Sequence, residues 1–275
     1  MGRRSGRPGG REKDGTMIDS VTGGNRHNIL QELGFSVRLA AGRIHGDGRI
    51  TPHMHVPGTG RLRTSILAAW ADHLAGRLAV EVMTPRVPVT LDLDVHLYRP
   101  APGTGTVHGT GRTIKAGRSV YIAGIDFTTG DGRPVATATG AFMSAPDPSV
   151  VMPDLTAPPS PAPERLLSVP FAERAGCRRR EPGTAVLPRS DEGLNAAGTM
   201  SGGLTALVAE EAVLAHAPGQ TLSSLALRYL HAIRTGPALA TASLHHGLAT
   251  ARIHDTGNND RLAITATART FPHAP

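Results

Sequence analysis

The chain has 275 residues, of which 39% are hydrophobic and only 3% aromatic, so Ala, Val, Leu and Ile must fill its core. Its formal charge is +7, but the arginines are scattered and lack interleaved aromatic side chains, which excludes a typical nucleic-acid binder. The single Cys177 excludes an intramolecular disulfide and a cysteine-based zinc site, and it suits a reducing compartment. No apolar run is long enough for a membrane span. We therefore expect a cytoplasmic protein with no nucleic-acid or membrane partner.

Four segments follow one another along the chain. Residues 1–17 are rich in Gly and Arg and are expected to form a disordered tail. Residues 144–170 contain eight prolines without a periodic apolar pattern, which is typical of an extended linker. This linker separates two predicted domains, residues 18–143 and 171–275. Both domains follow the same order, with a short strand region, an Ala-rich helix and then several strands.

Each predicted domain carries one helix with an acidic residue in its middle. The stretch "RLRTSILAAWADHLAGRLA", residues 61–79, is apolar nearly all round but contains Asp72. Setting Asp72 against Glu210 aligns "LRTSILAAWAD" with "MSGGLTALVAE", so that small and aliphatic positions match over two and a half turns. The acidic side of the first helix also carries Ser65, Ala69 and Gly76, and small residues beside an acid favour close packing of another element.

Alternating strands follow both helices. In "VPVTLDLDVHLY", residues 87–98, one face is predicted to hold Val87, Val89, Leu91, Leu93, Val95 and Leu97. The second half repeats this pattern with Leu225, Leu227 and Tyr229. Turn sequences such as "GDGR" and "TGNND" favour antiparallel hairpins. The predicted class is α+β, with two antiparallel sheets that each wrap around a central helix and pack together as an intramolecular pseudo-dimer.

The two halves resemble the PaaI-like acyl-CoA thioesterases of the hotdog fold, in a double-hotdog arrangement within the 4-hydroxybenzoyl-CoA thioesterase-like superfamily. The resemblance rests on "AWAD" and "VAEE" in the helices, on "DLDVHLYRPAP", and on "KAGRSVYIAGIDF" followed by "GRPVATATGAF". It implies hydrolysis of an acyl-CoA, with coenzyme A as part of the substrate and no separate cofactor. It also implies that the acid of one central helix faces the amino end of the other, where glycine N–H groups hold the thioester carbonyl.

Helix geometry agrees with this crosswise expectation. Asp72 follows Ser65 by seven residues, which places it about 10 Å along its own helix and out of reach of that helix's first N–H groups. The other half must therefore supply the amides. Unpaired N–H groups at a helix start can stabilise the oxyanion that forms when a thioester is attacked. A nearby carboxylate can act as nucleophile or general base.

The two expected composite sites are unequal. The second-half sequence "NAAGTMSGG" resembles the family's wording, so we predict an active site made of Asp72, Asn195, Gly202 and Gly203. The first-half sequence has Thr64 and Ser65 at the glycine positions, and Glu210 is therefore expected to be a relic or a weaker second site. Because Glu211 follows Glu210, one of the two is expected to be solvated. The resemblance implies a histidine just before the two glycines, where this sequence has Met200 and Ser201. His53 and His55 are candidates to replace that histidine.

Basic residues of the first half are candidates for binding the phosphates of coenzyme A. The hairpin "GRTIKAGRSV" offers Arg112, Lys115 and Arg118 for charge-assisted hydrogen bonds. The alternative is an ordinary solvated hairpin face. The matching stretch "ASLHHGLAT" has two histidines and no arginine. We predict no metal site, because the histidines lack carboxylates at helical spacing; they are His53, His55, His245 and His246.

Other functions stay open at this stage. The sequence contains no G-x-S-x-G elbow, no dinucleotide-binding glycine pattern and no P-loop. The non-enzymatic alternative is a degenerate hotdog protein that binds an acyl-CoA or another hydrophobic ligand. An enoyl-CoA hydratase on the same fold ranks third, because its Asp and His pair is not seen. Pairing of two chains into a homodimer is also possible, since related folds often pair.

Overall fold

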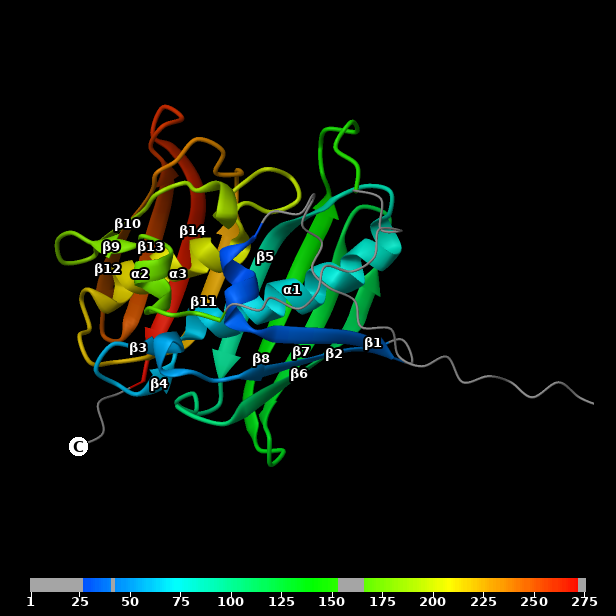
Figure 1. Ribbon diagram of the computed structural model, residues 1–275. Helices are drawn as coiled ribbons and strands as arrows, with labels where there is room; N and C mark the ends of the chain where they lie inside the picture. Colours follow the sequence, from blue (N-terminus) through cyan, green and yellow to red (C-terminus); the bar gives the residue numbers. More distant parts are fainter. Residues whose placement is uncertain (1–26, 41–42, 153–165, 272–275) are drawn as a thin grey trace, which may run out of the picture.

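Figure 1 shows the computed structural model, which describes residues 27–40, 43–152 and 166–271. The predicted tail, residues 1–17, and the central part of the predicted linker, residues 153–165, lie outside the described residues. Within them, the chain forms one large sheet and two principal helices.

The elements up to residue 144 contain the first principal helix. They are η1 (Ile29–Leu33), β1 (Phe35–Ala40), β2 (Arg43–Arg49), η2 (Pro52–Met54), β3 (His55–Val56), β4 (Arg61–Leu62), α1 (Thr64–Met83), β5 (Pro88–Leu97), β6 (Thr106–Ala116), β7 (Tyr121–Thr129) and β8 (Pro134–Ser144).

The elements after residue 166 contain the second principal helix. They are α2 (Phe171–Arg174), β9 (Arg178–Arg179), β10 (Thr184–Leu187), η3 (Asp191–Gly193), α3 (Gly202–Leu214), β11 (Leu222–Tyr229), β12 (Ala238–His245), β13 (Leu248–Asp255) and β14 (Arg261–Thr270). The predicted order of strand region, helix and strands is present in both parts.

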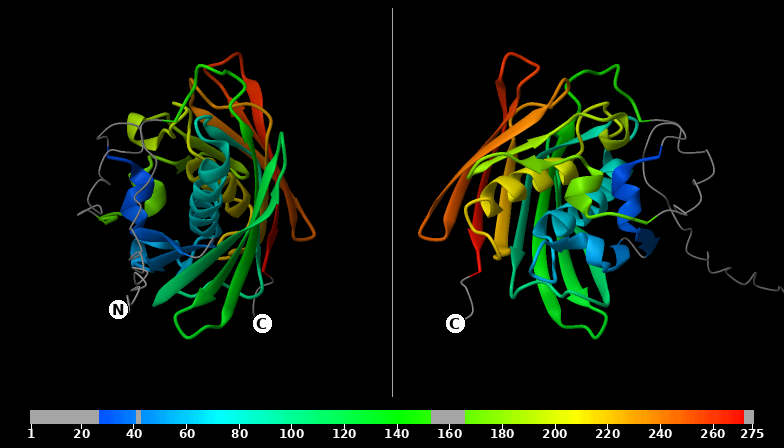
Figure 2. Two further views of the ribbon diagram at one scale, coloured as in Figure 1. Left: turned by 90° about the vertical axis from the view of Figure 1, so that its right-hand side faces the viewer. Right: turned by 60° about the vertical axis from the view of Figure 1, so that its left-hand side comes forward.

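Twelve strands form a single sheet in the order β1-β2-β6-β7-β8-β5-β11-β14-β13-β12-β10-β9. Every pair of neighbours in it is antiparallel, and β5 pairs with β11 at the middle of the sheet, where Asp94 lies opposite Ala226. From this central pair outward, the strand order on one side matches the order on the other. Both α1 and α3 lie against the same face of the curved sheet (Figures 1 and 2).

The core lies between this face of the sheet and the two helices. Leu93 and Val95 on β5, and Leu225 and Leu227 on β11, are completely buried. Their burial follows the predicted alternation, because successive strand residues point to opposite faces. The helices contribute Ala and Leu side chains to the same core, with Trp70 stacked on Phe35 at a ring separation of 4.8 Å.

The predicted single apolar face of residues 87–98 is wrong in its first part. A β-bulge interrupts the pairing of β5 with β8, because Thr90 pairs with Phe142 and Asp92 with Ala141, so that Leu91 has no register partner. A bulge adds one residue and changes which side chains face the core. Thr90 therefore reaches the helix side of the sheet. Two valines before the bulge pack in a separate small cluster with Val80, Ala145 and Met152; they are Val87 and Val89.

The structure also bears on membrane spans and on the single cysteine. No helix in the described part of the chain is long and apolar enough to cross a membrane. Cys177 is buried, and burial raises the pKa of its thiol to about 12, so the thiol is unreactive at neutral pH.

Candidate active site

The acids of α1 and α3 each lie at the first turn of the other helix. Asp72 and Glu210 are both the ninth residue of their helix. Glu210 Oε1 accepts a hydrogen bond of 2.9 Å from the backbone N–H of Thr64, the first residue of α1. In the opposite direction, Asp72 Oδ2 is only 2.6 Å from the position that a Cβ atom on Gly202 would occupy. The crosswise placement predicted from helix length is therefore confirmed.

The start of α1 is closed by Glu210. Besides Thr64, the N–H of Ser65 donates to Glu210 Oε1 at 3.4 Å, and the Ser65 hydroxyl donates to Oε2 at 2.6 Å. The carboxylate is 0% exposed. A carboxylate in this position satisfies N–H groups that have no partner within their own helix. The idea of Glu210 as a catalytic acid is thus corrected, since its oxygens cap α1 and cannot reach a substrate.

A buried ion-pair network surrounds this capped helix start. The guanidinium of Arg63, also fully buried, lies 3.2 Å from Glu210 and 2.6 Å from Glu211. Glu211 in turn pairs with Arg179 at 2.7 Å. The expectation that one of the two glutamates is solvated is wrong, because arginine partners from other elements allow both to be buried.

Asp72 has fewer partners and remains partly exposed. The Thr90 hydroxyl donates a hydrogen bond of 2.9 Å to Asp72 Oδ1. Burial of the carboxylate among apolar groups raises the pKa of Asp72 to about 6, although the hydrogen bond from Thr90 opposes the shift. The acid is therefore ionised near neutral pH and remains a stronger base than an exposed aspartate.

The amide groups that start α3 have no protein partner. Among the residues that the structure describes, none accepts a hydrogen bond from the N–H of Gly202 or Gly203. The hydroxyl of Ser201, the N-cap residue, is buried and also has no hydrogen-bond partner there. The two amides are the counterparts of the Thr64 and Ser65 N–H groups that Glu210 satisfies, so the start of α3 retains unused hydrogen-bonding capacity.

The two glycines of α3 have different neighbours. A Cβ atom on Gly203 would lie 2.6 Å from Ala69 Cβ and 3.1 Å from Leu30 of η1, so this glycine allows the helices to cross closely. A Cβ atom on Gly202 would instead meet the carboxylate of Asp72. Gly202 is therefore the position that keeps space next to the acid.

Three side chains of this site were missed by the sequence analysis; they are Thr90, Thr205 and Tyr229. Thr205 Oγ1 donates to the carbonyl oxygen of Gly202 at 2.8 Å, and the Tyr229 hydroxyl is 3.4 Å from Thr205 Oγ1. Burial and the charge of Asp72 both raise the pKa of Tyr229. Thr90 was overlooked because the bulge could not be predicted from alternation, and Tyr229 because its strand position indicated only a core role.

Asn195 uses its side chain to close a turn ahead of α3. Its side-chain oxygen accepts hydrogen bonds from Ala197 N and from the N–H and hydroxyl of Thr199, at 3.0 to 3.1 Å. The residue is exposed. Asn commonly closes a turn in this way by mimicking a backbone acceptor. The side-chain oxygen of Asn195 is thus used within its own turn, and contact of Asn195 with a substrate stays a prediction.

The histidines proposed as substitutes have other surroundings. His55 Nε2 lies 2.7 Å from the carbonyl oxygen of Gly103, and His53 lies on the neighbouring turn η2. His245 and His246 are exposed at the β12–β13 hairpin. Within the described residues, no group of three or more His, Cys, Asp or Glu side chains is arranged to hold a metal ion.

The predicted phosphate-binding residues lie on the β6–β7 hairpin. Arg112, Lys115 and Arg118 are all exposed. Arg112 pairs with Asp126 at 2.6 Å, while the other two are accessible to a ligand. This arrangement fits both an anion-binding hairpin and a solvated face.

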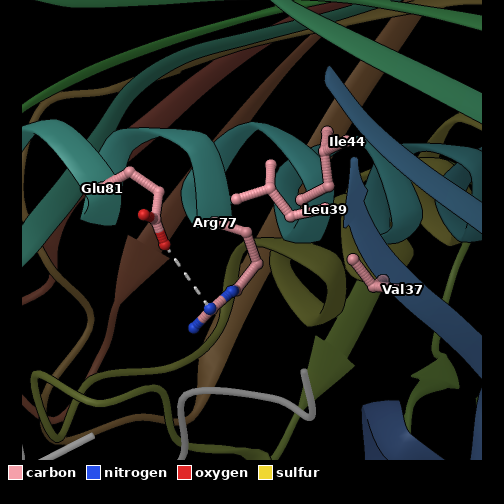
Figure 3. A pocket seen from close by; sticks show the side chains of 5 residues that line it. All are labelled: Val37, Leu39, Ile44, Arg77 and Glu81. Atoms are coloured by element: carbon pink, nitrogen blue, oxygen red, sulfur yellow. Dashed lines mark ion pairs between the residues drawn. The ribbon is translucent and has the colours of Figure 1, made fainter. Parts of the chain in front are cut away.

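A small pocket lies elsewhere along α1 (Figure 3). Its lining consists of Val37, Leu39 and Ile44 from β1 and β2, and of Arg77 and Glu81 from α1. Arg77 and Glu81 are 3.9 Å apart. The pocket lining contains neither the Asp72 carboxylate nor the first amides of α3, so it is distinct from the site between the helices.

Comparisons with known proteins agree with the fold. Residues 64–136, which include Asp72 and Thr90, match the family model described as the thioesterase superfamily. The chain matches none of the curated proteins with which it was compared.

Several solved structures share the fold at low sequence identity. The 12:0-ACP thioesterase from Umbellularia californica is 12% identical, with a TM-score of 0.62, and covers 85% of this chain and 99% of its own. The tesB protein of Mycobacterium avium subs paratuberculosis is 17% identical, with a TM-score of 0.59 and coverages of 89% and 98%. A putative oleoyl thioesterase from Lactobacillus plantarum is 16% identical, with a TM-score of 0.59 and coverages of 84% and 97%.

These similarities extend over most of the chain, and the predicted resemblance is confirmed at the level of the superfamily. The protein has the hotdog fold, and its residues 64–136 match the family model of the thioesterase superfamily.

Proposed function

We propose that the protein hydrolyses an acyl thioester at the start of α3, with Asp72 as the catalytic carboxylate. The observation that carries this proposal is the placement of Asp72 Oδ2 beside Gly202, where the first amides of a helix have no protein partner. A carboxylate and an oxyanion-binding group are the two parts that acyl transfer to water requires.

In the proposed reaction, the substrate carbonyl oxygen approaches the N–H groups of Gly202 and Gly203. Asp72 removes a proton from a water molecule as the water oxygen attacks the carbonyl carbon, or attacks that carbon itself to give an anhydride that water then hydrolyses. The negative charge that develops on the carbonyl oxygen is stabilised by the amides and by the dipole of α3. The C–S bond breaks when this tetrahedral adduct collapses, and the thiolate leaves and takes up a proton. In the nucleophilic route this cleavage forms the anhydride, which water hydrolyses afterwards. The hydrogen bond from Thr90 orients the carboxylate.

We propose an acyl-CoA as the substrate, with its phosphates near Lys115, Arg118 and, after loss of its ion pair, Arg112. The exposed position of these cations supports the proposal. An acyl group carried by a carrier protein is the second candidate, because one structural neighbour is described as a 12:0-ACP thioesterase. Comparing acyl-CoA with acyl carrier protein as substrates distinguishes them.

We further propose that residues 18–143 and 171–275 are two hotdog units, joined by residues 144–170 into an intramolecular pseudo-dimer with one productive site per chain. The matching strand order on the two sides of the β5–β11 pair supports this arrangement. Two such chains can pair further as a homodimer, which light scattering would test.

The alternative is a catalytically inactive hotdog protein that binds an acyl-CoA or another hydrophobic ligand. The missing histidine and the capped start of α1 favour it. The partial exposure of Asp72 and the free amides of α3 favour the enzyme instead.

The deciding experiment measures thiol release from short, long, branched and aromatic acyl-CoAs by the wild type and by Asp72→Asn. We expect the variant to lose activity by at least about 10³-fold, because a neutral amide is neither base nor nucleophile. Glu210→Gln is the matched control and should retain activity. Equal activity of wild type and Asp72→Asn would overturn the proposed mechanism. Acyl-CoA binding without turnover by the wild type would establish the binding protein.

A further inference from the structure

The strands β5 and β11 carry equivalent positions that can be compared residue by residue. Both strands contain a β-bulge, between Thr90 and Asp92 in β5 and between Leu222 and Ser224 in β11. Counting from the bulges, the buried Leu93 and Leu225 correspond. Two residues further along, Val95 corresponds to Leu227, and the next position on the same face is Leu97 in β5 and Tyr229 in β11.

Tyr229 and Leu97 differ in polarity, as the open start of α3 and the capped start of α1 differ in free hydrogen-bonding groups. Tyr229 lies next to the open start of α3, since its hydroxyl is 3.2 Å from the position that a Cβ atom on Gly202 would occupy. Leu97 is its equivalent for the half in which Glu210 caps α1. A hydroxyl is therefore present beside the open helix start, and a side chain without a polar group takes its place in the other half.

The hydrogen-bonding pattern leaves the Tyr229 proton available. Thr205 uses its own proton to donate to the carbonyl oxygen of Gly202, at 2.8 Å. Thr205 Oγ1 can therefore only accept from Tyr229, and at 3.4 Å this contact is long for a hydrogen bond between two hydroxyl groups. A better acceptor placed next to Gly202 would compete successfully for the same proton.

We infer that the Tyr229 hydroxyl donates a hydrogen bond to the carbonyl oxygen of the bound acyl thioester, alongside the amides that start α3. The inference rests on the proposed function and adds a side-chain donor to it. Tyr229 remains protonated throughout and transfers no proton, which agrees with the raised pKa of its hydroxyl. It supplies a donor in the site where the resemblance implies a histidine that this sequence lacks.

Tyr229→Phe tests the inference, since it removes only the hydroxyl. We expect kcat to fall about 10- to 100-fold with KM nearly unchanged, because the hydrogen bond strengthens as charge develops on the oxygen. Tyr98→Phe is the matched control, because Tyr98 is 63% exposed, and it should behave as wild type. An unchanged kcat in Tyr229→Phe would overturn the inference.

The pH profile separates this role from an effect on the acid. If Tyr229 acts on the substrate, the acidic limb of the kcat/KM profile stays where it is in the wild type and only the plateau falls. A displaced limb with an unchanged plateau would show that Tyr229 acts on Asp72, and it would overturn the inference. Activity that survives in Asp72→Asn contradicts the proposed function separately.

A binding experiment provides a readout without turnover. Two stable coenzyme A derivatives of equal chain length are compared by calorimetry: an acyl analogue with CH₂ in place of the thioester sulfur, which keeps the carbonyl, and an alkyl thioether, which lacks it. Tyr229→Phe should weaken binding of the carbonyl analogue about 3- to 10-fold and leave binding of the thioether unchanged. Equal losses for both, or no loss for either, would overturn the inference even if the protein proves to be a binding protein.

Discussion

The starts of α1 and α3 each lie next to the acid of the other helix, but only the amides of α1 are bound by that acid. At α1, the longer side chain of Glu210 reaches the first amides and accepts their hydrogen bonds, together with that of Ser65. At α3, the shorter Asp72 stops beside Gly202, and the amides stay free. The two helix starts thus differ in the length of the acidic side chain, by one methylene group, and in the residues of the first helical turn. These differences decide whether the protein caps the helix or leaves its start open to a ligand.

The largest expected effect comes from removing the cap of α1. Glu210→Ala leaves the buried Arg63 with one carboxylate partner instead of two and three donors of Thr64 and Ser65 without an acceptor. We expect the free energy of unfolding to fall by about 3–5 kcal/mol, measured by urea denaturation. Thiol release per folded molecule should change little. A large loss of activity without a loss of stability would contradict the structural role of Glu210.

The next effect comes from making the open start resemble the closed one. Asp72→Glu adds one methylene group, so the carboxylate is expected to reach the amides of Gly202 and Gly203 and to cap α3 as Glu210 caps α1. Activity should fall about 10²- to 10³-fold, because the oxyanion donors are occupied. The melting temperature should rise by a few degrees, since a cap contributes about 1 kcal/mol. Retained activity in this variant would show that the free amides are not required.

The raised pKa of Asp72 predicts a pH dependence of activity. Since its pKa is raised to about 6, kcat/KM should fall about tenfold per pH unit below pH 6, as the carboxylate takes up a proton. A pH–rate profile between pH 4 and 8 measures this limb. A profile that is flat across pH 6 would exclude Asp72 as the titrating base.

The same shift predicts an opposite effect on stability. Between the ordinary value of 3.8 and about 6, the folded protein holds a proton on Asp72 that the unfolded chain releases, so the stability from this group falls as the pH rises through that range. Asp72→Asn removes this term and should raise the melting temperature at pH 7 but not at pH 3. If Asp72→Asn were less stable than the wild type at pH 7, burial of the charged carboxylate would not cost the expected free energy.

The smallest effect is expected on the β6–β7 hairpin. Lys115→Ala and Arg118→Ala should raise KM for an acyl-CoA about two- to fivefold and leave kcat unchanged, because exposed charge pairs contribute less than about 1 kcal/mol each. Added salt should weaken wild-type binding by a similar factor. If KM is unaffected by both substitutions and by salt, the hairpin is only a solvated surface.

Sequence patterns predicted the fold and the crosswise placement of the two acids. The helical period located both acids, and their alignment predicted the crosswise arrangement, because helix length fixes which residues can meet. Alternation failed at the bulge of β5, where one extra residue brings Thr90 to the helix side. Tyr229 could not be assigned from its strand alone, since its role depends on contact with α3, more than twenty residues earlier in the chain. Contacts between elements distant in sequence leave no local pattern.

The central pairing of β5 with β11 within one polypeptide has an evolutionary consequence. In an assembly of two identical chains, every substitution occurs twice, so a glutamate that seals one helix start would seal both. Here the two strands belong to one chain, and the residues at Asp72 and Glu210 can change independently. One gene product can therefore close one helix start with a carboxylate and leave the other open.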